Sequence, residues 1–457
     1  MKAMSLREIA AACGGCYVGD ESKLDLKVTG VAIDSRKIEE GYLFIPIKGA
    51  RVDGHTFISQ VMEKGALCTL SEQKLESATY PYIQVTSCQQ ALKDLAEHYR
   101  KALDVKVVGI TGSVGKTSTK EMIASVLSQK YCVLKTEGNF NNEIGLPLTI
   151  FQIRKEHEVA VLEMGISDFE EMHRLAKMAR PDVCVITNIG LCHLENLGDR
   201  DGILKAKTEM FDYRQPNAKI ILNGDDDKLI TVKEREGVEP LYFGLSQAMS
   251  AYAEDIKSLS LRGTTCKIHL GEESFEVQIP IPGSHMVHNA LAGALVGKEL
   301  GLSVSEIKAG IESLVPVAGR NHLIATEDLL IIDDCYNANP VSTKASLDVL
   351  ATADSRKVAI LGDMFELGER EKELHFEVGS HAAAKGIDLV ICIGELSKET
   401  AKGADVGNTQ VKHFDTKAEF LKEASTILQK GDTVLVKASH GMEFPEIVDA
   451  LQKMNLE

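Results

Sequence analysis

The sequence lacks long apolar runs, internal repeats, low-complexity tracts and long disordered linkers. No apolar run approaches the ~20 residues that a membrane-spanning helix needs, and residues 1–20 lack the basic segment and apolar core of a secretory signal. An excess of basic residues is also lacking, since 67 acidic residues stand against 51 lysines and arginines. The net charge of −16 at pH 7 argues against binding along a nucleic-acid backbone or an anionic membrane surface. These absences favour a soluble enzyme.

The ten cysteines are scattered along the chain. Cys184 and Cys392 lie within apolar runs, where a small buried thiol is expected. Cys13 and Cys16 have the C-x-x-C spacing of a redox or half-zinc motif. No second pair stands nearby and no thioredoxin-like context surrounds them, so a metal or redox role is disfavoured. This use of cysteine fits a reducing cytoplasm.

Apolar runs that alternate with helical patterns predict an α/β protein, and a length of 457 residues suggests roughly three domains at about 150 residues each. We expect a small α/β domain over 1–98, a central mostly parallel sheet over 99–313 and a Rossmann-like, doubly wound domain over 314–457. The expected central strands are 105–110, 159–165, 183–190 and 219–225, with an antiparallel edge hairpin over 258–281. The expected C-terminal strands are 329–333, 357–362, 389–394 and 433–438.

The segment T-G-S-V-G-K-T-S over 111–118 follows the first central strand and leads into a helical pattern over 119–131. Its glycines let backbone N–H groups approach phosphate oxygens, and the helix N-terminus adds partial positive charge. Lys116 would reach the β- and γ-phosphates, and the Thr117 hydroxyl would ligate Mg²⁺. The loop is shorter than the standard P-loop, because Ile110 stands where that pattern has glycine. A structural glycine turn is the alternative, but the flanking strand and helix favour ATP binding.

Three further residues belong to the central domain. Glu163 ends an apolar strand at the edge where ligands bind, so it is placed to hold Mg²⁺, although a solvated strand-end glutamate is the alternative. His193 follows the next strand at the same edge. Lys205 and Lys207 are two residues apart on an expected helix, so one would be solvated while the other turns inward. An inward lysine near Mg²⁺ would be repelled as a cation, whereas a neutral amine could react with CO₂ to give an anionic N-carboxylate ligand.

Asn139, Asn141 and Asn142 form a dense group of amides before Gly145 and Pro147. Amides offer paired donors and acceptors that suit sugar hydroxyls, peptide groups or an adenine edge. A turn cluster is the alternative, and the density of the group slightly favours a binding loop.

Several motifs resemble a known family. T-G-S-V-G-K-T over 111–117, L-E-M-G over 162–165, C-H-L-E-N-L-G over 192–198 and A-K-T-E over 206–209 are similar to the central domain of the Mur ligases. These cytoplasmic, ATP-dependent amino-acid ligases build the peptide of bacterial cell-wall precursors. Three longer segments, over 138–147, 333–340 and 361–369, resemble the members that add a D-alanyl-D-alanine dipeptide. The resemblance covers all three domains.

The resemblance implies a ligase that joins D-alanyl-D-alanine to UDP-N-acetylmuramoyl-tripeptide through an acyl phosphate, giving the pentapeptide precursor of peptidoglycan. It therefore implies ATP, magnesium (two ions) and a carbamate on Lys207 as cofactors. It also implies roles in cell wall biogenesis, cell shape, cell division and the cell cycle, a cytoplasmic location, no nucleic-acid partner, no membrane insertion and a monomer.

The resemblance also implies the site residues. Thr117 and Glu163 would hold the Mg²⁺ shared with the β- and γ-phosphates. Glu163, His193 and carbamylated Lys207 would hold a second Mg²⁺. The catalytic residues would be Lys116, Glu163, His193, Lys207 and Arg320. The ATP-binding residues would be Gly112, Ser113, Val114, Gly115, Lys116, Thr117, Ser118, Asn289, Arg320 and Asp334. The residues that bind the other substrates would be Ser35, Arg36, Lys48, Asp53, His55, Asn139, Asn141, Asn142, Tyr336, Asn337, Asn339, Asp363 and Glu366.

The sequence departs from the family pattern at a few positions. Met286 stands where many relatives carry Asn, and His322 where Glu is frequent. Ala438, His440 and Glu443 alter a late segment in which G-S-R and a following basic residue are common. These departures bear on adenine contacts and on acceptor docking, not on the reaction.

Alternative functions are a sibling ligase that adds the third amino acid, a folylpolyglutamate-synthase-like enzyme and a non-catalytic nucleotide switch. The segments over 333–340 and 361–369 argue against the first two. A nucleotide switch has no use for Glu163, His193 and Lys207 together, so their joint presence favours an enzyme.

Overall fold

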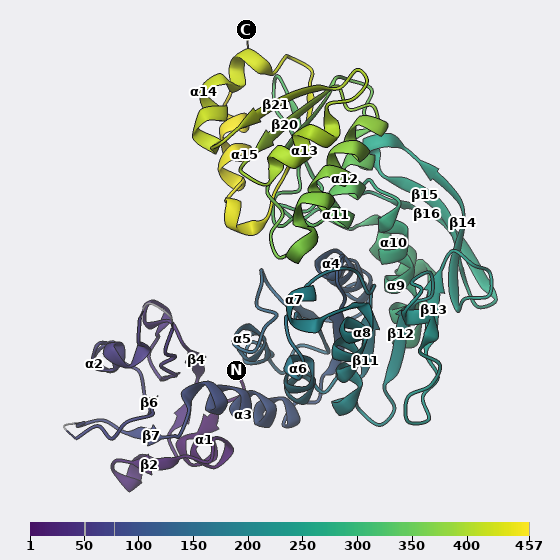
Figure 1. Cartoon of the computed structure of the whole chain (residues 1–457). Coiled ribbons are helices and arrows are strands. Elements are labelled where there is room, and N and C mark those ends of the chain that lie inside the picture. Colours follow the sequence, from purple (N-terminus) through teal and green to yellow (C-terminus); the bar gives the residue numbers. More distant parts are fainter. Residues whose placement is uncertain (50–51, 77, 457) are drawn as a thin grey trace. The chain divides into compact units, whose positions relative to one another are not determined.

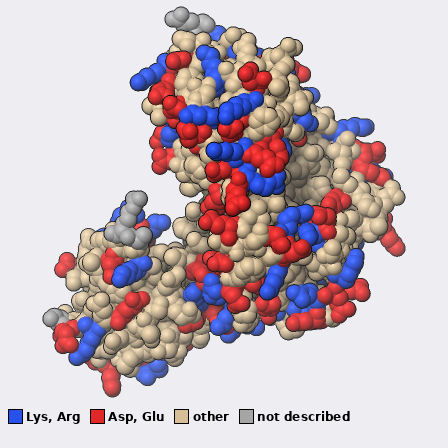
Figure 2. All heavy atoms as spheres, viewed as in Figure 1, with Lys and Arg blue, Asp and Glu red and all other residues tan. Residues whose placement is uncertain are grey.

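The computed structural model describes residues 1–49, 52–76 and 78–456 (Figure 1). The chain divides into two compact units. The first unit consists of residues 1–111, 130–185 and 207–219, and the second of residues 112–129, 186–206 and 220–457. Within the described part of the chain, no helix has the length and apolar character needed to cross a membrane. On the face in Figure 2, acidic and basic side chains are interspersed.

The N-terminal part of the first unit is a small α/β fold, as predicted. Its five-stranded sheet has the order β2 (Cys16–Val18), β7 (Tyr82–Gln84), β6 (Cys68–Ser71), β5 (Tyr42–Phe44) and β4 (Gly30–Ala32). The short strands β1 (Met4–Ser5) and β3 (Lys27–Val28) pair separately. The helices are α1 (Leu6–Ala12), α2 (Ile58–Glu63) and α3 (Cys88–Lys101). Helix α3 was not predicted, and the predicted domain boundary at residue 98 falls within it.

The remainder of the first unit contains four adjacent strands in the order β11 (Val183–Ile186), β8 (Lys106–Thr111), β10 (Val159–Glu163) and β9 (Val133–Lys135). The pairs β10–β8 and β10–β9 are parallel. Every residue of β10 and β11 is buried, which is typical of a parallel sheet covered on both faces. The helices of this part include α5 (Gly145–Ile150) and α6 (Glu171–Ala179). Helix α8 (Arg200–Thr208) begins in the second unit, and its last two residues belong to the first.

The second unit contains a run of five adjacent strands, β12 (Lys219–Asn223), β13 (Leu241–Gly244), β14 (Ala251–Ser258), β15 (Thr264–Leu270) and β16 (Glu273–Ile279). The first three are parallel, and β14, β15 and β16 are antiparallel. The predicted edge hairpin is therefore confirmed. Its inward residues alternate along β15 and β16, as expected for a sheet with one buried face.

Three helices of the second unit pack closely through glycine. These are α4 (Lys116–Leu127), α9 (His285–Glu299) and α10 (Val304–Glu312). A Cβ at Gly293 would lie 3.0 Å from Met122 Cγ, one at Gly297 would lie 2.9 Å from Val126 Cγ1, and one at Gly310 would lie 2.4 Å from Val126 Cα. The missing side chains thus let α9 and α10 approach α4, whose N-terminus follows the phosphate loop.

The C-terminal part of the second unit has a six-stranded sheet. Its order is β17 (His322–Ala325), β18 (Leu330–Asp333), β22 (Thr433–Lys437), β19 (Lys357–Gly362), β20 (Leu389–Ile393) and β21 (Gln410–Phe414). All neighbours are parallel except β17 and β18. The helices α11 (Pro340–Leu350), α12 (Glu371–Ala384), α13 (Ser397–Ala404), α14 (Lys417–Ile427) and α15 (Pro445–Gln452) follow the strands, and two apolar clusters form the core. The doubly wound prediction is confirmed.

We expect Gly379→Ala to destabilise the protein, because a Cβ at this position on α12 would lie 2.0 Å from the Thr400 carbonyl oxygen on α13. Overpacking of this kind costs about 1–3 kcal/mol, whereas helix propensity alone would make alanine more stabilising by ~1 kcal/mol. Urea denaturation distinguishes overpacking from helix propensity: the free energy of unfolding should fall if the Cβ overpacks and rise if helix propensity dominates. Lys372→Ala, at an exposed position of the same helix, is the control, with a change within about 0.5 kcal/mol.

Candidate active site

The phosphate loop lies before α4 and has a conformation that requires glycine. Gly115 caps the helix with φ 81°, a left-handed conformation that few other residues adopt. Gly112 has φ 153°, and a Cβ there would lie only 1.9 Å from Thr187 Oγ1. Lys116 Nζ donates to the Gly112 carbonyl oxygen at 2.8 Å. The lysine and the first amides of α4 therefore lie where an anion would bind.

The loop over 187–193 holds the phosphate loop in place. Asn188 accepts from Val114 N through Oδ1 (2.9 Å) and donates to Val114 O through Nδ2 (2.8 Å). Ser113 N donates to the Asn188 carbonyl at 3.1 Å, and Gly190 N donates to Ser113 Oγ at 2.8 Å. Ser113 and Val114, both predicted to bind ATP, thus use their N–H groups to fix the shape of the loop. Asn188 was not predicted.

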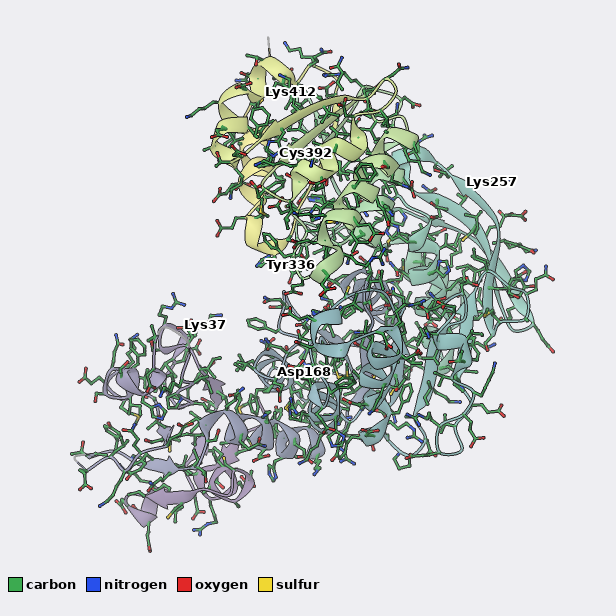
Figure 3. The ribbon with its side chains drawn as sticks, viewed as in Figure 1. Lys37, Asp168, Lys257, Tyr336, Cys392 and Lys412 are labelled. Carbon is green, nitrogen blue, oxygen red and sulfur yellow. The ribbon has the colours of Figure 1, made fainter. Side chains whose placement is uncertain are left out.

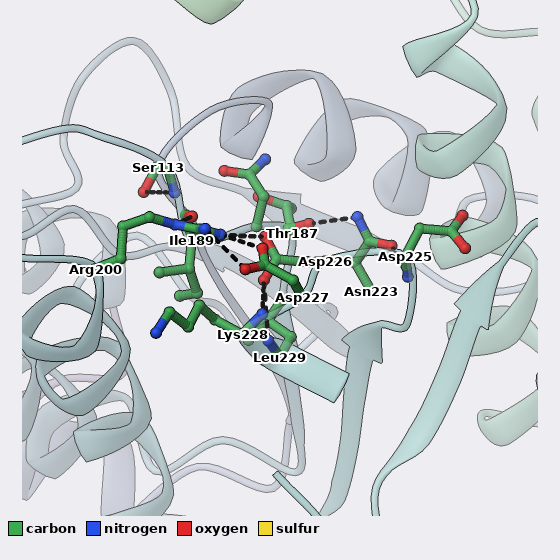
Figure 4. A network of polar contacts seen from close by, with 12 residues as sticks. Ser113, Thr187, Ile189, Arg200, Asn223, Asp225, Asp226, Asp227, Lys228 and Leu229 are labelled. Carbon is green, nitrogen blue, oxygen red and sulfur yellow. Dashed lines mark hydrogen bonds and ion pairs between the residues drawn. The ribbon is translucent and has the colours of Figure 1, made fainter. Parts of the chain in front are cut away.

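An acidic network supports the same 187–193 loop (Figure 4). The Arg200 guanidinium forms a bidentate pair with Asp227 and donates through Nε to the Ile189 carbonyl at 2.8 Å. Asp226 Oδ2 accepts from Ile189 N at 2.8 Å. Both backbone polar groups of Ile189 are therefore held by side chains, which fixes the start of the segment that carries His193.

A first cavity, here called the phosphate-loop cavity, has a volume of about 230 Å³. It extends from Gly115 and Ser118 to side chains that include Phe243, His288 and Asn289. Three predicted ATP-binding residues outside the loop, Asn289, Arg320 and Asp334, all line this cavity. The fold therefore places these three residues, which are far apart in the sequence, around one cavity.

Asn289 is 7% exposed, and its amide is held on both sides. Its Oδ1 accepts from Thr119 Oγ1 at 2.9 Å, and its Nδ2 donates to Met286 Sδ at 3.2 Å. Met286, one of the departures from the family pattern, thus orients the amide of Asn289.

Arg320 lies against the phosphate loop. Its Nη2 donates to Thr117 Oγ1 at 3.3 Å, and its guanidinium carbon lies 4.1 Å from the centroid of the Tyr336 ring. The predicted γ-phosphate arginine and the predicted Mg²⁺-binding threonine are therefore in direct contact.

Asp334 forms a buried ion pair that the sequence analysis did not predict. Lys437 Nζ lies 2.5 Å from Asp334 Oδ2, and the two residues are 3% and 6% exposed. Ser346 Oγ also donates to Oδ2 at 2.5 Å, and Asn321 N donates to Oδ1 at 3.2 Å. Lys437 further donates to the Asn337 carbonyl at 3.1 Å, so it ties two predicted site residues together.

A second cavity, here called the polar cavity, has a volume of about 220 Å³. The phosphate-loop residues Ser113 and Lys116 line it together with His193, Glu366 and His440. His193 has φ 58°, and its Nδ1 lies 3.4 Å from Glu366 Oε2. Lys116 and two residues predicted for separate roles, His193 and Glu366, therefore share one cavity.

Other predicted substrate-binding side chains organise the loops around the polar cavity. Asn339 Oδ1 accepts from Ser342 N at 2.9 Å and caps α11. Asn337 Oδ1 accepts from His440 N at 3.3 Å. Asp363 was expected to face substrate, but it is 6% exposed and its carboxylate accepts from Ser397 N (2.7 Å) and Glu395 N (3.1 Å). Asp363 therefore holds the start of α13.

Glu163 and Lys207 belong to the first unit, and both are 2% exposed. Glu163 ends β10, and its Oε1 accepts from Asn141 Nδ2 at 2.9 Å. Lys205, two residues before Lys207 on α8, is exposed. The prediction that one of these lysines is solvated and the other turns inward is confirmed.

The asparagine-rich loop contains a turn, which the sequence left open as the alternative to a binding loop. Asn142 Oδ1 accepts from Ile144 N (3.1 Å) and Gly145 N (2.8 Å), which closes a turn. Asn141 instead orients Glu163, and Asn139 is exposed.

The predicted residues of the N-terminal sheet lie in loops after β4 and β5. Hydrogen bonds from the Arg36 guanidinium and backbone N–H lower the pKa of Asp34 to about 2. The Arg36 side chain remains 85% exposed. Lys48 pairs with Asp53 in an isolated bridge, and Asp53 Oδ1 lies 2.7 Å from His55 Nδ1.

His55 was predicted to bind substrate, but its ring is engaged within the protein. Its Nδ1 faces Asp53, and its Nε2 accepts from Glu72 N at 3.2 Å. Both ring nitrogens therefore serve to hold the loop. Of this group, Arg36 and Lys48 are exposed.

Among residues 1–49, 52–76 and 78–456, no three His, Cys, Asp or Glu side chains form a group that could hold a metal ion. The predicted Mg²⁺ ligands include only two side chains of these types, Glu163 and His193. The other two predicted ligands are the Thr117 hydroxyl and a modified Lys207.

Comparison with known proteins identifies the family. Residues 110–297 match the Mur ligase middle domain, residues 319–440 the Mur ligase glutamate ligase domain, and residues 27–100 the Mur ligase family catalytic domain. The UDP-N-acetylmuramoyl-tripeptide--D-alanyl-D-alanine ligase of Bacillus subtilis (strain 168) is 38% identical to the chain and aligns over 93% of each protein. The chain belongs to the Mur ligase family.

Other relatives of this Mur ligase agree. The Escherichia coli (strain K12) protein with the same name is 34% identical over 95% of this chain and 96% of its own length. MurF from Acinetobacter baumannii has a TM-score of 0.91 at 30% identity, covering 99% of this chain and 100% of that one. MurF ligase from Thermotoga maritima in complex with ADP has a TM-score of 0.83 at 32% identity, and the match covers 93% of this chain and 97% of that one. These matches support ATP use by this Mur ligase.

We expect Lys437→Met to lower the free energy of unfolding by about 3–5 kcal/mol, because it leaves the buried Asp334 carboxylate without its cation. Urea denaturation measures the change. The control is Lys430→Met, which removes a lysine that is 58% exposed and lies 3.9 Å from Asp328, and which should cost about 0–1 kcal/mol. Equal losses in the two variants would contradict a structural role for the buried pair.

Proposed function

We propose that this Mur ligase joins D-alanyl-D-alanine to UDP-N-acetylmuramoyl-tripeptide with ATP, giving the UDP-linked pentapeptide of peptidoglycan synthesis. The observation that carries the proposal is a basic side chain beside the phosphate loop in each of the two cavities. Lys116 lines the polar cavity, and Arg320 lines the phosphate-loop cavity while donating to Thr117. The names and extents of the relatives support the same substrates.

The residues fit acyl-phosphate chemistry. A carboxylate is a poor acylating agent, so its oxygen first attacks the γ-phosphorus of ATP, and ADP leaves. The amine of the dipeptide then attacks the acyl carbon, loses a proton and expels phosphate. Lys116 and Arg320 would neutralise the charge that develops on the transferring phosphoryl group.

The predicted ATP-binding residues have distinct roles in this proposal. Gly112, Gly115, Lys116, Thr117 and Ser118 would contact the phosphates, while Ser113 and Val114 shape the loop through Asn188. Asn289 would face adenine and Asp334 ribose, since both line the phosphate-loop cavity.

The UDP-linked substrate and the dipeptide would bind at different places. Arg36, with its exposed charge, and the neighbouring Ser35 and Lys48 would bind the UDP end. The polar cavity, with Glu366, Tyr336 and the Asn337–Asn339 loop nearby, would receive the dipeptide amine.

Magnesium would be held by hydroxyl and carboxylate oxygens, which this cation prefers. Thr117 and Glu163 would hold one ion, and Glu163, His193 and Lys207 the other; the ions would supply charge neutralisation at the phosphates. The buried carboxylate of Glu163, with one oxygen oriented by Asn141, fits this role. Lys207 would carry a carbamate formed when its neutral amine adds to CO₂ and loses a proton.

The wider proposals follow from the family. Matched ranges of 27–100, 110–297 and 319–440 support domains at 1–98, 99–313 and 314–457. We also propose a cytoplasmic monomer that acts in cell wall biogenesis, cell shape and cell division.

The direct experiment is ADP release by the purified protein with UDP-N-acetylmuramoyl-tripeptide, with and without D-alanyl-D-alanine. Turnover should require both. Turnover with a single amino acid in place of the dipeptide would favour a sibling ligase, and turnover with neither would favour a nucleotide switch.

Lys116→Ala should abolish ligation chiefly through kcat, because stabilisation of developing charge is typically worth several kcal/mol. Steady-state kinetics with ATP varied measures kcat and KM separately. Lys402→Ala, which removes a 64%-exposed lysine, is the control. An unchanged kcat in Lys116→Ala would refute the phosphate-loop assignment.

Lys207→Ala should remove nearly all ligation while leaving ATP affinity largely intact, because Lys116 and Thr117 still hold the phosphates. Lys205→Ala, on the exposed face of the same helix, should be nearly silent. Small carboxylates should partly restore Lys207→Ala. Carbon-13 NMR of the native enzyme under ¹³CO₂ should show a carbamate signal that the Lys207→Ala variant lacks. If the native enzyme shows no such signal and Lys207→Ala is fully active, the carbamate on Lys207 is contradicted.

A further inference from the structure

The side chain of Arg320 is held between a hydroxyl and an aromatic ring. Its Nη2 donates to Thr117 Oγ1 at 3.3 Å, and its guanidinium carbon lies 4.1 Å from the centroid of the Tyr336 ring. Tyr336 is labelled in Figure 3, at the lower edge of the green ribbon. A cation at this distance from a ring face is attracted by the ring quadrupole.

The backbone around this arginine is tied to the segment that carries the ring. Gly319 N donates to Asp333 Oδ2 at 2.7 Å, Asn321 N donates to Asp334 Oδ1 at 3.2 Å, and Tyr336 N donates to the Gly319 carbonyl at 3.3 Å. Gly319 has φ 75°, and a Cβ there would lie 3.2 Å from Tyr336 Cβ. The arginine and the ring therefore approach each other on a fixed backbone.

The same ring also contacts His440. Their centroids lie 5.4 Å apart with an interplanar angle of 37°, and His440 N donates to Asn337 Oδ1. Arg320 lines the phosphate-loop cavity, whereas His440 lines the polar cavity. Tyr336 thus connects a residue of one cavity with a residue of the other.

We propose that Tyr336 is a positioning residue that holds the Arg320 guanidinium ready for the transferring phosphoryl group, with His440 supporting the ring. This inference rests on the proposed ligase function. It differs from the role implied by the sequence, in which Tyr336 binds substrate.

The chemistry of the guanidinium favours a ring over a carboxylate in this position. The five N–H donors of arginine lie in the guanidinium plane, so a ring against its face holds the cation and leaves the donors for oxygens at the edge. A carboxylate partner would take two of those donors and cancel the charge. The contact with Thr117 is an edge contact of this kind. A pre-positioned cation costs no reorganisation when charge develops on the phosphoryl group.

The test compares Tyr336→Leu with Tyr336→Phe in the ligation assay. Arg320 and Tyr336 are both partly buried, so the cation–π contact should be worth more than an exposed one and less than a desolvated one. Loss of the ring should therefore lower kcat by roughly tenfold, with KM for all three substrates within about twofold. Tyr336→Phe keeps the ring and should retain most of kcat. The control is Tyr252→Leu, which breaks a stacked ring pair with His269 (centroids 4.4 Å apart) on β14 and β15 and should leave kcat unchanged. Thermal unfolding shows whether each variant is folded.

A double-mutant cycle with Arg320→Lys tests whether the ring acts through the arginine. A lysine ammonium lacks the planar face of arginine, so Tyr336→Leu should cost much less in the Arg320→Lys background than in the native one. Additive losses would overturn the inference. A rise in KM for the UDP substrate or the dipeptide with unchanged kcat would also overturn it and support substrate binding. An inactive native enzyme would instead refute the proposed function.

Discussion

The conformation of the phosphate loop depends on its hydrogen bonds to the loop over 187–193, above all those of the Asn188 side chain. The Asn188 amide bonds both polar groups of the Val114 backbone, so the tightest part of the loop is closed by a residue from a different strand end. Peptide groups that are hidden from water need partners, and here the partner comes from a loop that is itself fixed by Arg200, Asp226 and Asp227. The position of Lys116 is therefore determined by residues more than 70 positions away in the sequence.

Much of the fold could be predicted from the sequence, because buried parallel strands are continuously apolar. The run over 159–165 and the strand Val159–Glu163 differ only at the end, and the edge hairpin was recognised by its alternation. The strands β17 and β21 were missed. Both lie at the edges of the C-terminal sheet, where partial exposure weakens the apolar signal. Helix α3 was also missed, although its buried face repeats at helical spacing.

The candidate site could be predicted only in part, because motifs identify residues but not their partners. Arg320 and Thr117 were expected near the same phosphate, and they are in contact. The predicted substrate residues Asp363 and His55 instead hold backbone amides. Lys437 lies in the late segment that contains Ala438 and His440, but its partner Asp334 is 103 positions away, so the segment did not reveal the ion pair. A sequence pattern does not reveal whether a polar side chain faces a ligand or the chain itself.

The three glycines that let α9 and α10 approach α4 have a consequence for how sequence variation should be interpreted. A Cβ at Gly293, Gly297 or Gly310 would first meet atoms of a neighbouring helix. Thr119 on α4 and Asn289 on α9 are joined by a hydrogen bond between two of these helices. A larger residue at any of the three would separate α4 from its neighbours and move one wall of the phosphate-loop cavity. If these glycines are invariant among related enzymes, the reason would therefore be the fixed spacing between the helices. Such invariance would not be evidence that the glycines contact a ligand.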